Sequence, residues 1–155
     1  MNYKSVNELN KFTFQDAQLM NLSIENDTVT FELEAVIVKA TNSANEMMCD
    51  SYAGTMALRF VRAEISQLFL EGYRYYDADN VLQKTVPDTP IPLEDYRETF
   101  RKLKRGYLYE PEKTGENTYM IGVDLEEGED TYWFTLKFER VIAEWDRYMN
   151  KVQSE

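Results

Sequence analysis

The chain has 155 residues, of which 43% are hydrophobic and 14% aromatic, and this size suits one domain with its own core. Its formal net charge of -11 argues against nucleic acid and anionic membrane surfaces as partners, because both are bound by Lys and Arg. With no histidine and one cysteine, Cys49, the chain excludes Ser–His and Cys–His nucleophile pairs, histidine- or thiolate-caged metals, and internal disulfides.

The first residues, MNYKSVNELNKF, lack the apolar segment and small-residue cleavage site of a secretory signal peptide. The longest apolar runs are too short to cross a bilayer, and the single cysteine fits a reducing compartment. We therefore expect a cytoplasmic protein. Ser5 and Glu8 match a capping box, which predicts a short helix or turn over 6–11 within an N-terminal arm, residues 1–11.

Two runs with a period of two flank the pair Asn26-Asp27. Leu22 and Ile24 alternate with polar residues before the pair, and apolar residues alternate from Val29 onward. Asn and Asp tolerate the left-handed backbone of tight turns, so this pattern predicts a β-hairpin with one buried face.

Residues 41–54, TNSANEMMCDSYAG, follow no period and predict a long loop. In the next segment, 55–77, alternate apolar residues change phase after Val61. This change indicates two strands separated by a bulge or turn near Arg62. A helix over 61–71, capped by Gly72, is the alternative interpretation, and we favour the strands.

Residues 85–92 contain three of the four prolines and predict an extended connection. A helix is predicted over 93–105, ended by Gly106, because four apolar residues share one helical face: Leu93, Tyr96, Phe100 and Leu103. Acidic residues come early and basic residues late in this segment, which suits the helix dipole.

Alternation predicts two further strands, over 119–125 and 132–138, joined by an acidic hairpin loop over 126–130. Helical spacing then predicts a C-terminal helix from about Ile142, with a frayed tail over 152–155 and a face formed by Ile142, Trp145, Met149 and Val152. The expected fold is a single α+β domain, residues 1–155, with a mainly antiparallel sheet of hairpins packed by one or two helices.

Acidic residues offer two candidate sites, each with a plainer interpretation. Asp16 follows two phenylalanines and is either a working carboxylate or a turn residue that binds backbone amides, which we favour. The acidic run at the predicted hairpin loop, which includes Asp124, Glu126 and Glu127, could hold a cation, but solvation of a hairpin tip is the favoured interpretation. Asp77 begins a calcium-loop-like pattern that fails at its later positions, so a plain turn is expected there.

Two further sets of residues are candidates for partner binding. Met47, Met48 and Tyr52 lie in the long loop and either contact a partner or fold back as a lid with Cys49. A basic strip consists of Arg97, Arg101, Lys104 and Arg105. It could bind an anion or an acidic partner, but pairing with Glu94 and Glu98 on the same helix is favoured.

These features predict a small acidic, non-catalytic binding or interaction module. It would bind a protein partner, for example as an acidic inhibitor of a basic protein, or associate with itself as a homodimer. The predicted partner-binding residues are Met47, Met48, Tyr52, Arg101 and Arg105; no catalytic residue, metal ligand or cofactor is predicted. The alternatives are a hydrolase that uses carboxylates, with or without a divalent metal, and a small-molecule carrier built on a curved sheet.

Overall fold

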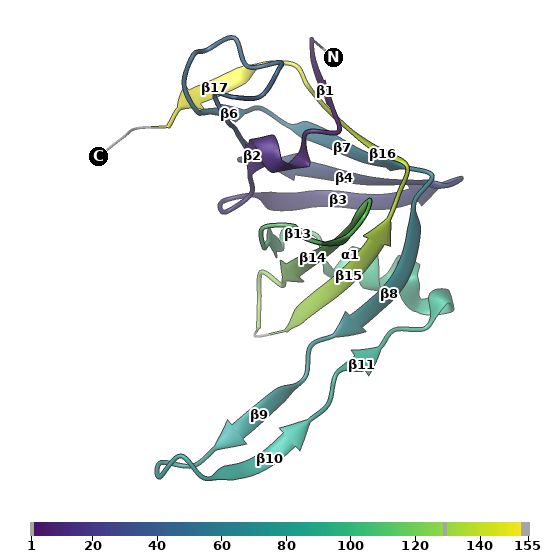
Figure 1. Cartoon of the computed structure of the whole chain (residues 1–155). Coiled ribbons are helices and arrows are strands. Elements are labelled where there is room, and N and C mark those ends of the chain that lie inside the picture. The colour runs from purple at the N-terminus through teal and green to yellow at the C-terminus, as the bar shows by residue number, and fades with distance from the viewer. Residues whose placement is uncertain (1, 129, 153–155) are drawn as a thin grey trace.

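The computed structural model describes residues 2–128 and 130–152. Its main feature is an antiparallel sheet, to which the described residues contribute eleven strands (Figure 1). The strands follow one another across the sheet in the order β1 (Tyr3–Val6), β16 (Arg140–Trp145), β7 (Met56–Val61), β4 (Thr28–Glu34), β3 (Gln18–Glu25), β12 (Tyr107–Leu108), β14 (Thr118–Asp124), β15 (Thr131–Lys137), β8 (Glu64–Leu70) and β11 (Thr89–Pro90), with β13 (Glu112–Gly115) also paired to β14.

Two segments of the chain run through both halves of this sheet. β7 continues into β8 after Arg62 and Ala63, and β15 continues into β16 after Phe138 and Glu139. Arg62 has a φ of 52°, a left-handed conformation that redirects the chain between β7 and β8. The half that contains β1, β16, β7, β4 and β3 is thereby turned to face the half that contains β12, β14, β15, β8 and β11.

The core lies between these two halves and is built on a cluster of aromatic rings. Phe31 on β4 lies edge-on to Phe60 on β7, with ring centroids 5.6 Å apart, and to Phe134 on β15, 6.1 Å away. Phe100 extends the cluster to the helix, 5.9 Å from Phe134, and Phe138 lies 4.9 Å from Phe60. Such tilted and edge-on pairs add to the stabilisation that burial of the rings provides.

The helix predicted over 93–105 is present in shorter form. A 3₁₀ turn, η2 (Leu93–Asp95), leads into α1 (Tyr96–Lys102), which buries Phe100 against the sheet. The helix ends at Lys102 and a turn follows in which Arg105 has a φ of 71°, so the prediction that Gly106 ends the helix is wrong. Gly106 serves close packing instead, because an added Cβ would lie 2.5 Å from the carbonyl oxygen of Asp124.

The predicted C-terminal helix is also wrong, since this segment forms β16 and β17 (Tyr148–Lys151). Val141, Ala143 and Trp145 alternate inward along β16 and are buried. β17 belongs to a small antiparallel sheet with the order β17, β6 (Ser51–Ala53), β5 (Ile37–Val38) and β2 (Phe12–Thr13). Trp145 closes the large sheet against this small one, with its ring 5.9 Å from Phe12.

At the N-terminus, residues 3–6 of the predicted arm form β1, which pairs with β16, and the predicted short helix is a single 3₁₀ turn, η1 (Leu9–Lys11). Ser5 and Glu8 do interact, but through a side-chain hydrogen bond of 2.8 Å rather than through a helix cap. Of the predicted tail, 152–155, only Val152 lies within the described residues.

Several sequence predictions are confirmed. β3 and β4 form the predicted hairpin around Asn26, whose φ is 57°, and the segment 55–77 contains strands broken at Arg62 rather than the alternative helix. β14 and β15 pair as predicted on either side of the acidic loop. The fold is thus mainly antiparallel β-sheet with one short α-helix among the described residues. No helix in that part of the chain is long and apolar enough to cross a membrane.

Candidate interaction surface

A two-stranded hairpin, residues 73–86, projects from the end of the molecule (Figure 1). It consists of β9 (Tyr73–Tyr76) and β10 (Leu82–Val86), which pair with each other and form a separate two-stranded sheet. We call residues 73–86 the projecting hairpin. Within the described chain no third strand joins it, so the outer edge of each strand is open.

The turn of the projecting hairpin is held by Asp77. Its Oδ1 accepts hydrogen bonds from the backbone amides of Asp79 and Val81, each at 2.9 Å, and its Oδ2 accepts one from the side chain of Gln83 at 2.8 Å. Asn80 adopts the left-handed conformation with a φ of 63°. This geometry confirms the plain turn expected at Asp77, and it gives the end of the projecting hairpin a defined shape.

Both faces of the projecting hairpin carry large side chains. Residues that are directly opposite in the register share a face, which places Tyr73 and Tyr75 on one side and Tyr76 and Leu82 on the other. The rings of Tyr73 and Tyr75 make an edge-on contact, with centroids 4.9 Å apart. Because both faces carry apolar groups, the projecting hairpin cannot bury all of them by packing one face against the body.

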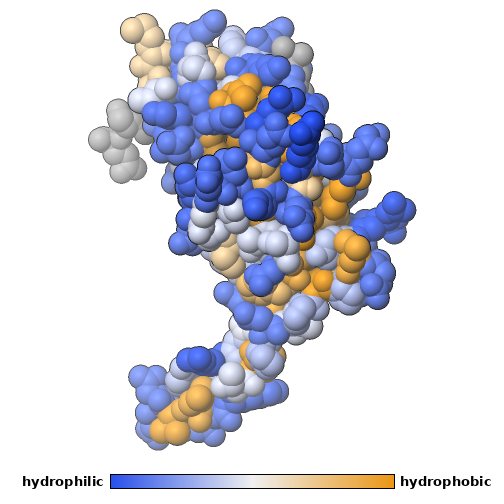
Figure 2. Space-filling model, turned by 45° about the vertical axis from the view of Figure 1, so that its right-hand side comes forward, coloured by the Kyte–Doolittle hydropathy of each residue, from blue (hydrophilic) through white to orange (hydrophobic). Residues whose placement is uncertain are grey.

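These side chains remain exposed. Tyr73, Tyr75, Tyr76, Val81 and Leu82 each keep 49–55% of their surface accessible. Figure 2 shows an apolar patch on the projecting hairpin, beyond the narrow neck that joins it to the body. A two-stranded hairpin alone is at best marginally stable in water, and exposed apolar groups of this kind are typical of interaction sites.

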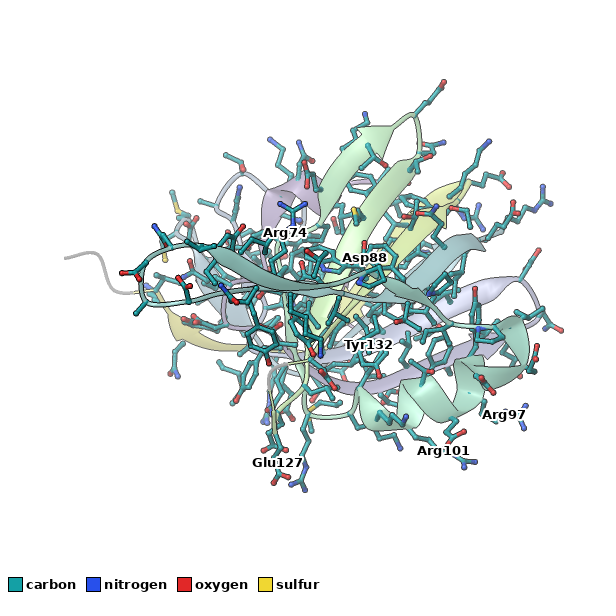
Figure 3. All side chains as sticks on the ribbon, turned by 90° about the horizontal axis from the view of Figure 1, so that it is seen from below. Arg74, Asp88, Arg97, Arg101, Glu127 and Tyr132 are labelled. Carbon is teal, nitrogen blue, oxygen red and sulfur yellow. The ribbon has the colours of Figure 1, made fainter. Side chains whose placement is uncertain are left out.

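The projecting hairpin is anchored at a tight crossing of two backbones. The amide of Gly72 donates a 2.7 Å hydrogen bond to the carboxylate of Asp88, which Figure 3 labels at the root. An added Cβ at Gly72 would lie 2.1 Å from the carbonyl oxygen of Val86, so only glycine fits at this crossing. The two ends of the projecting hairpin therefore leave the body side by side.

The predicted acidic sites are not brought together. Asp16 accepts a 2.7 Å hydrogen bond from the hydroxyl of Tyr52, which joins its turn to β6, rather than binding the backbone amides that the sequence suggested. This hydrogen bond is also the main cause that raises the pKa of Tyr52. Among the described residues no group of three or more Asp, Glu and Cys side chains is placed to hold a metal ion.

Asp124 is engaged within the sheet. It accepts a hydrogen bond from the hydroxyl of Thr131. A hydrogen bond to Asp124, together with burial, raises the pKa of Tyr109. Glu126 and Glu127 are exposed on the loop that follows, as expected for a solvated hairpin tip.

The segment predicted as a loop over 41–54 ends in a strand, since β6 contains Tyr52, and the candidate residues of this segment differ in exposure. Met48 is 93% exposed and adopts a φ of 62°, while Met47 and Tyr52 are half-buried. Cys49 is also half-buried, with its sulfur 3.7 Å from the hydroxyl of Ser51. The lid interpretation therefore does not describe Met48, whose side chain points to solvent.

The basic strip does not form the ion pairs that the sequence favoured. Among the described residues no carboxylate lies within ion-pair distance of Arg97, Arg101, Lys104 or Arg105. The ion pairs found among all the described residues join Arg59 to Glu144 and Arg62 to Glu139. The basic strip is thus an unpaired cationic surface on a chain of net charge -11.

Sequence reasoning missed the projecting hairpin as a candidate site. Its signal was present in Tyr73, Tyr75 and Tyr76, because adjacent aromatic residues point to opposite faces of a strand and both faces cannot reach one core.

No family model, curated protein or solved structure matches this chain.

Proposed function

We propose that this protein is a non-catalytic interaction module that binds protein partners through the projecting hairpin. The observation that carries the proposal is the exposure of three tyrosines, Val81 and Leu82 on a two-stranded sheet with open faces and edges. Tyrosine is enriched in protein interfaces, because its ring offers contact area at low entropic cost and its hydroxyl stays hydrogen-bonded.

The mode of binding follows from the geometry of the projecting hairpin. Its open edges can accept main-chain hydrogen bonds from a strand of the partner, and its two faces can be clasped at the same time. The side-chain turn at Asp77 fixes its shape before binding, which lowers the conformational entropy that association would cost.

The composition of the chain supports a binding role over catalysis. The sequence holds no histidine, and its single cysteine, Cys49, lies in the loop rather than in a site with a base. Asp16 and Asp124, two of the candidate acids, serve as hydrogen-bond acceptors for Tyr52 and Thr131 within the fold.

Excision of the projecting hairpin tests the proposal. Because the backbones of Gly72 and Val86 touch, Asn-Gly can replace residues 73–86 as a tight turn and leave the body closed. The tagged wild-type protein and the excision variant are incubated with lysate of the source organism, and retained proteins are identified by mass spectrometry. Each retained protein is then purified and its dissociation constant measured by calorimetry.

We expect excision to weaken a reconstituted complex by at least about thirtyfold, which corresponds to the 2 kcal/mol of a binding hot spot. The control is Met48→Ser, which removes an even more exposed apolar side chain from the loop and should leave the affinity unchanged. If the excision variant binds as tightly as the wild type, the partner contacts another surface and the proposal fails.

A further inference from the structure

A groove lies between helix α1 and strand β3. It has a volume of about 610 Å³, within the usual range of ligand and peptide sites. Four consecutive residues, Asn21 to Ile24, line one wall, and α1 with the residue that starts η2, Leu93, lines the other. Consecutive strand residues point to alternate faces, so a wall made of four in a row is the edge of the strand itself.

Among the residues that the structure describes, this edge of β3 is unpaired over most of its length. β4 pairs with one side of β3 from Gln18 to Glu25, but in the described chain β12 reaches the other side only at Gln18, and Arg105 and Gly106 add backbone hydrogen bonds to Leu19. In an antiparallel pair, every second residue turns its N–H and C=O away from the partner strand. The backbone of residues 21–24 therefore offers donors and acceptors to the groove.

The rest of the groove is apolar at its floor and cationic at its rim. Leu22 and Phe100 form buried parts of the lining, while Ile24 and Leu93 remain 44% and 76% exposed. Arg97 and Arg101 lie one turn apart on α1, and Lys104 lies in the turn that follows the helix. No carboxylate among the described residues pairs with these three cations. Figure 3 labels Arg97 and Arg101 on this helix. Glu94 is the one acidic side chain among the described residues that line the groove.

The groove therefore suits an extended segment that carries apolar side chains and has acidic groups at one end. Four residues of β3 extend for about 13 Å, which is the length of the four residues of β9; the five residues of β10 extend for about 17 Å. The projecting hairpin has its acidic groups at its end: β9 and β10 carry the cations Arg74 and Lys84, whereas Asp77 and Asp79 lie at the turn, and exposed Val81 and Leu82 follow them.

We propose that the occupant of the groove is the projecting hairpin of a second copy of this chain. This inference rests on the proposed function and names the partner. In a two-fold dimer the projecting hairpin of each protomer enters the groove of the other and adds a strand to the free edge of β3. Its acidic turn then meets Arg97, Arg101 and Lys104, and its apolar side chains cover Ile24 and Leu93.

The test measures the mass of the protein in solution by light scattering and the dissociation constant by sedimentation. At about 0.15 M salt the Debye length is about 8 Å, so long-range repulsion between the two acidic bodies is largely screened. The wild type should have twice the 18.3 kDa mass of the chain, and the variant with Asn-Gly in place of residues 73–86 should be a monomer.

Charge exchange then identifies the contact. Asp79→Lys alone, or Arg97→Glu with Arg101→Glu, should raise the dissociation constant at least about a hundredfold, because each change acts at both symmetric contacts. All three substitutions together should restore the dimer. Lys102→Glu, on the same helix but outside the groove, is the matched control and should have no effect. Circular dichroism confirms that each variant is folded.

The outcomes separate this inference from the proposed function. A monomeric wild type, or a dimer that the charge variants leave intact, overturns the second-copy assignment. The proposed function is decided separately by whether excision abolishes binding of a reconstituted heterologous partner. A dimer that survives excision of residues 73–86 refutes the inference, whatever the charge variants do.

Discussion

Phe134→Ala tests whether the two halves of the large sheet are packed on each other. Phe134 is fully buried on β15 and has one ring neighbour on the opposite half, Phe31, and one on the helix, Phe100. Truncation of this side chain removes both contacts and leaves a cavity at the centre of the core.

We expect the free energy of unfolding to fall by about 4 kcal/mol, since buried Phe→Ala changes cost roughly 3–5 kcal/mol. For 155 residues the entropy of unfolding is about 0.33 kcal/mol per kelvin, so the melting temperature should fall by about 12 °C. Urea denaturation gives the first quantity and calorimetry the second.

Met149→Ala is the control, because Met149 is 53% exposed on β17 and its truncation should change stability by no more than about 0.5 kcal/mol. A loss below about 1.5 kcal/mol for Phe134→Ala, in a variant whose heat capacity of unfolding is unchanged, would mean that β4, β15 and α1 are not closely packed around this ring and would refute the reasoning.

Three other changes have defined expectations. Gly122→Ala would place a Cβ 2.7 Å from the indole of Trp133, so stability should fall by about 1–3 kcal/mol in urea denaturation with a shift in tryptophan fluorescence; unchanged values would contradict the contact. Burial raises the pKa of Tyr148 to about 12. The contribution of the protonated Tyr148 side chain to the free energy of unfolding is therefore complete below pH 10 and is lost as the pH rises through 12. The difference in unfolding free energy between wild type and Tyr148→Phe should therefore narrow from pH 9 to pH 11.5, and a constant difference would exclude the shift. Burial alone would raise the pKa of Glu8, but hydrogen bonds from Ser43 and Ser5 lower it. The contribution of the ionised Glu8 side chain to the free energy of unfolding is therefore present above pH 4.5 and is lost on acidification. The stability difference between wild type and Glu8→Gln should narrow from pH 7 to pH 3, and a difference that widens would contradict this sign.

The parts of the fold that the sequence predicts correctly depend on neighbours in the chain. The hairpin of β3 and β4 is specified by alternation on either side of Asn26, and the turn and both strands lie within one short segment. The break at Arg62 was visible for the same reason, because a change of phase is a local property.

The C-terminal segment was misassigned because its environment is set by distant residues. Ile142, Trp145 and Met149 fit a helical face, but β16 lies between β7 and β1, whose residues are remote in the sequence. Pairing with both strands satisfies the backbone of 140–145 and outweighs the helical spacing. The projecting hairpin was missed for a similar reason, because a local pattern cannot show whether another part of the chain packs over a hairpin.

Because β7 continues into β8 and β15 continues into β16, the two halves of the large sheet should open together. Neither half of the large sheet can detach without withdrawing strands from the other, so the amide hydrogens of both halves should exchange with solvent through one common, rare opening. The amides of β9 and β10 have no such link and should exchange orders of magnitude faster. Binding of any partner at the projecting hairpin would then be seen directly, as slowed deuterium uptake in residues 73–86 while uptake in the body stays the same.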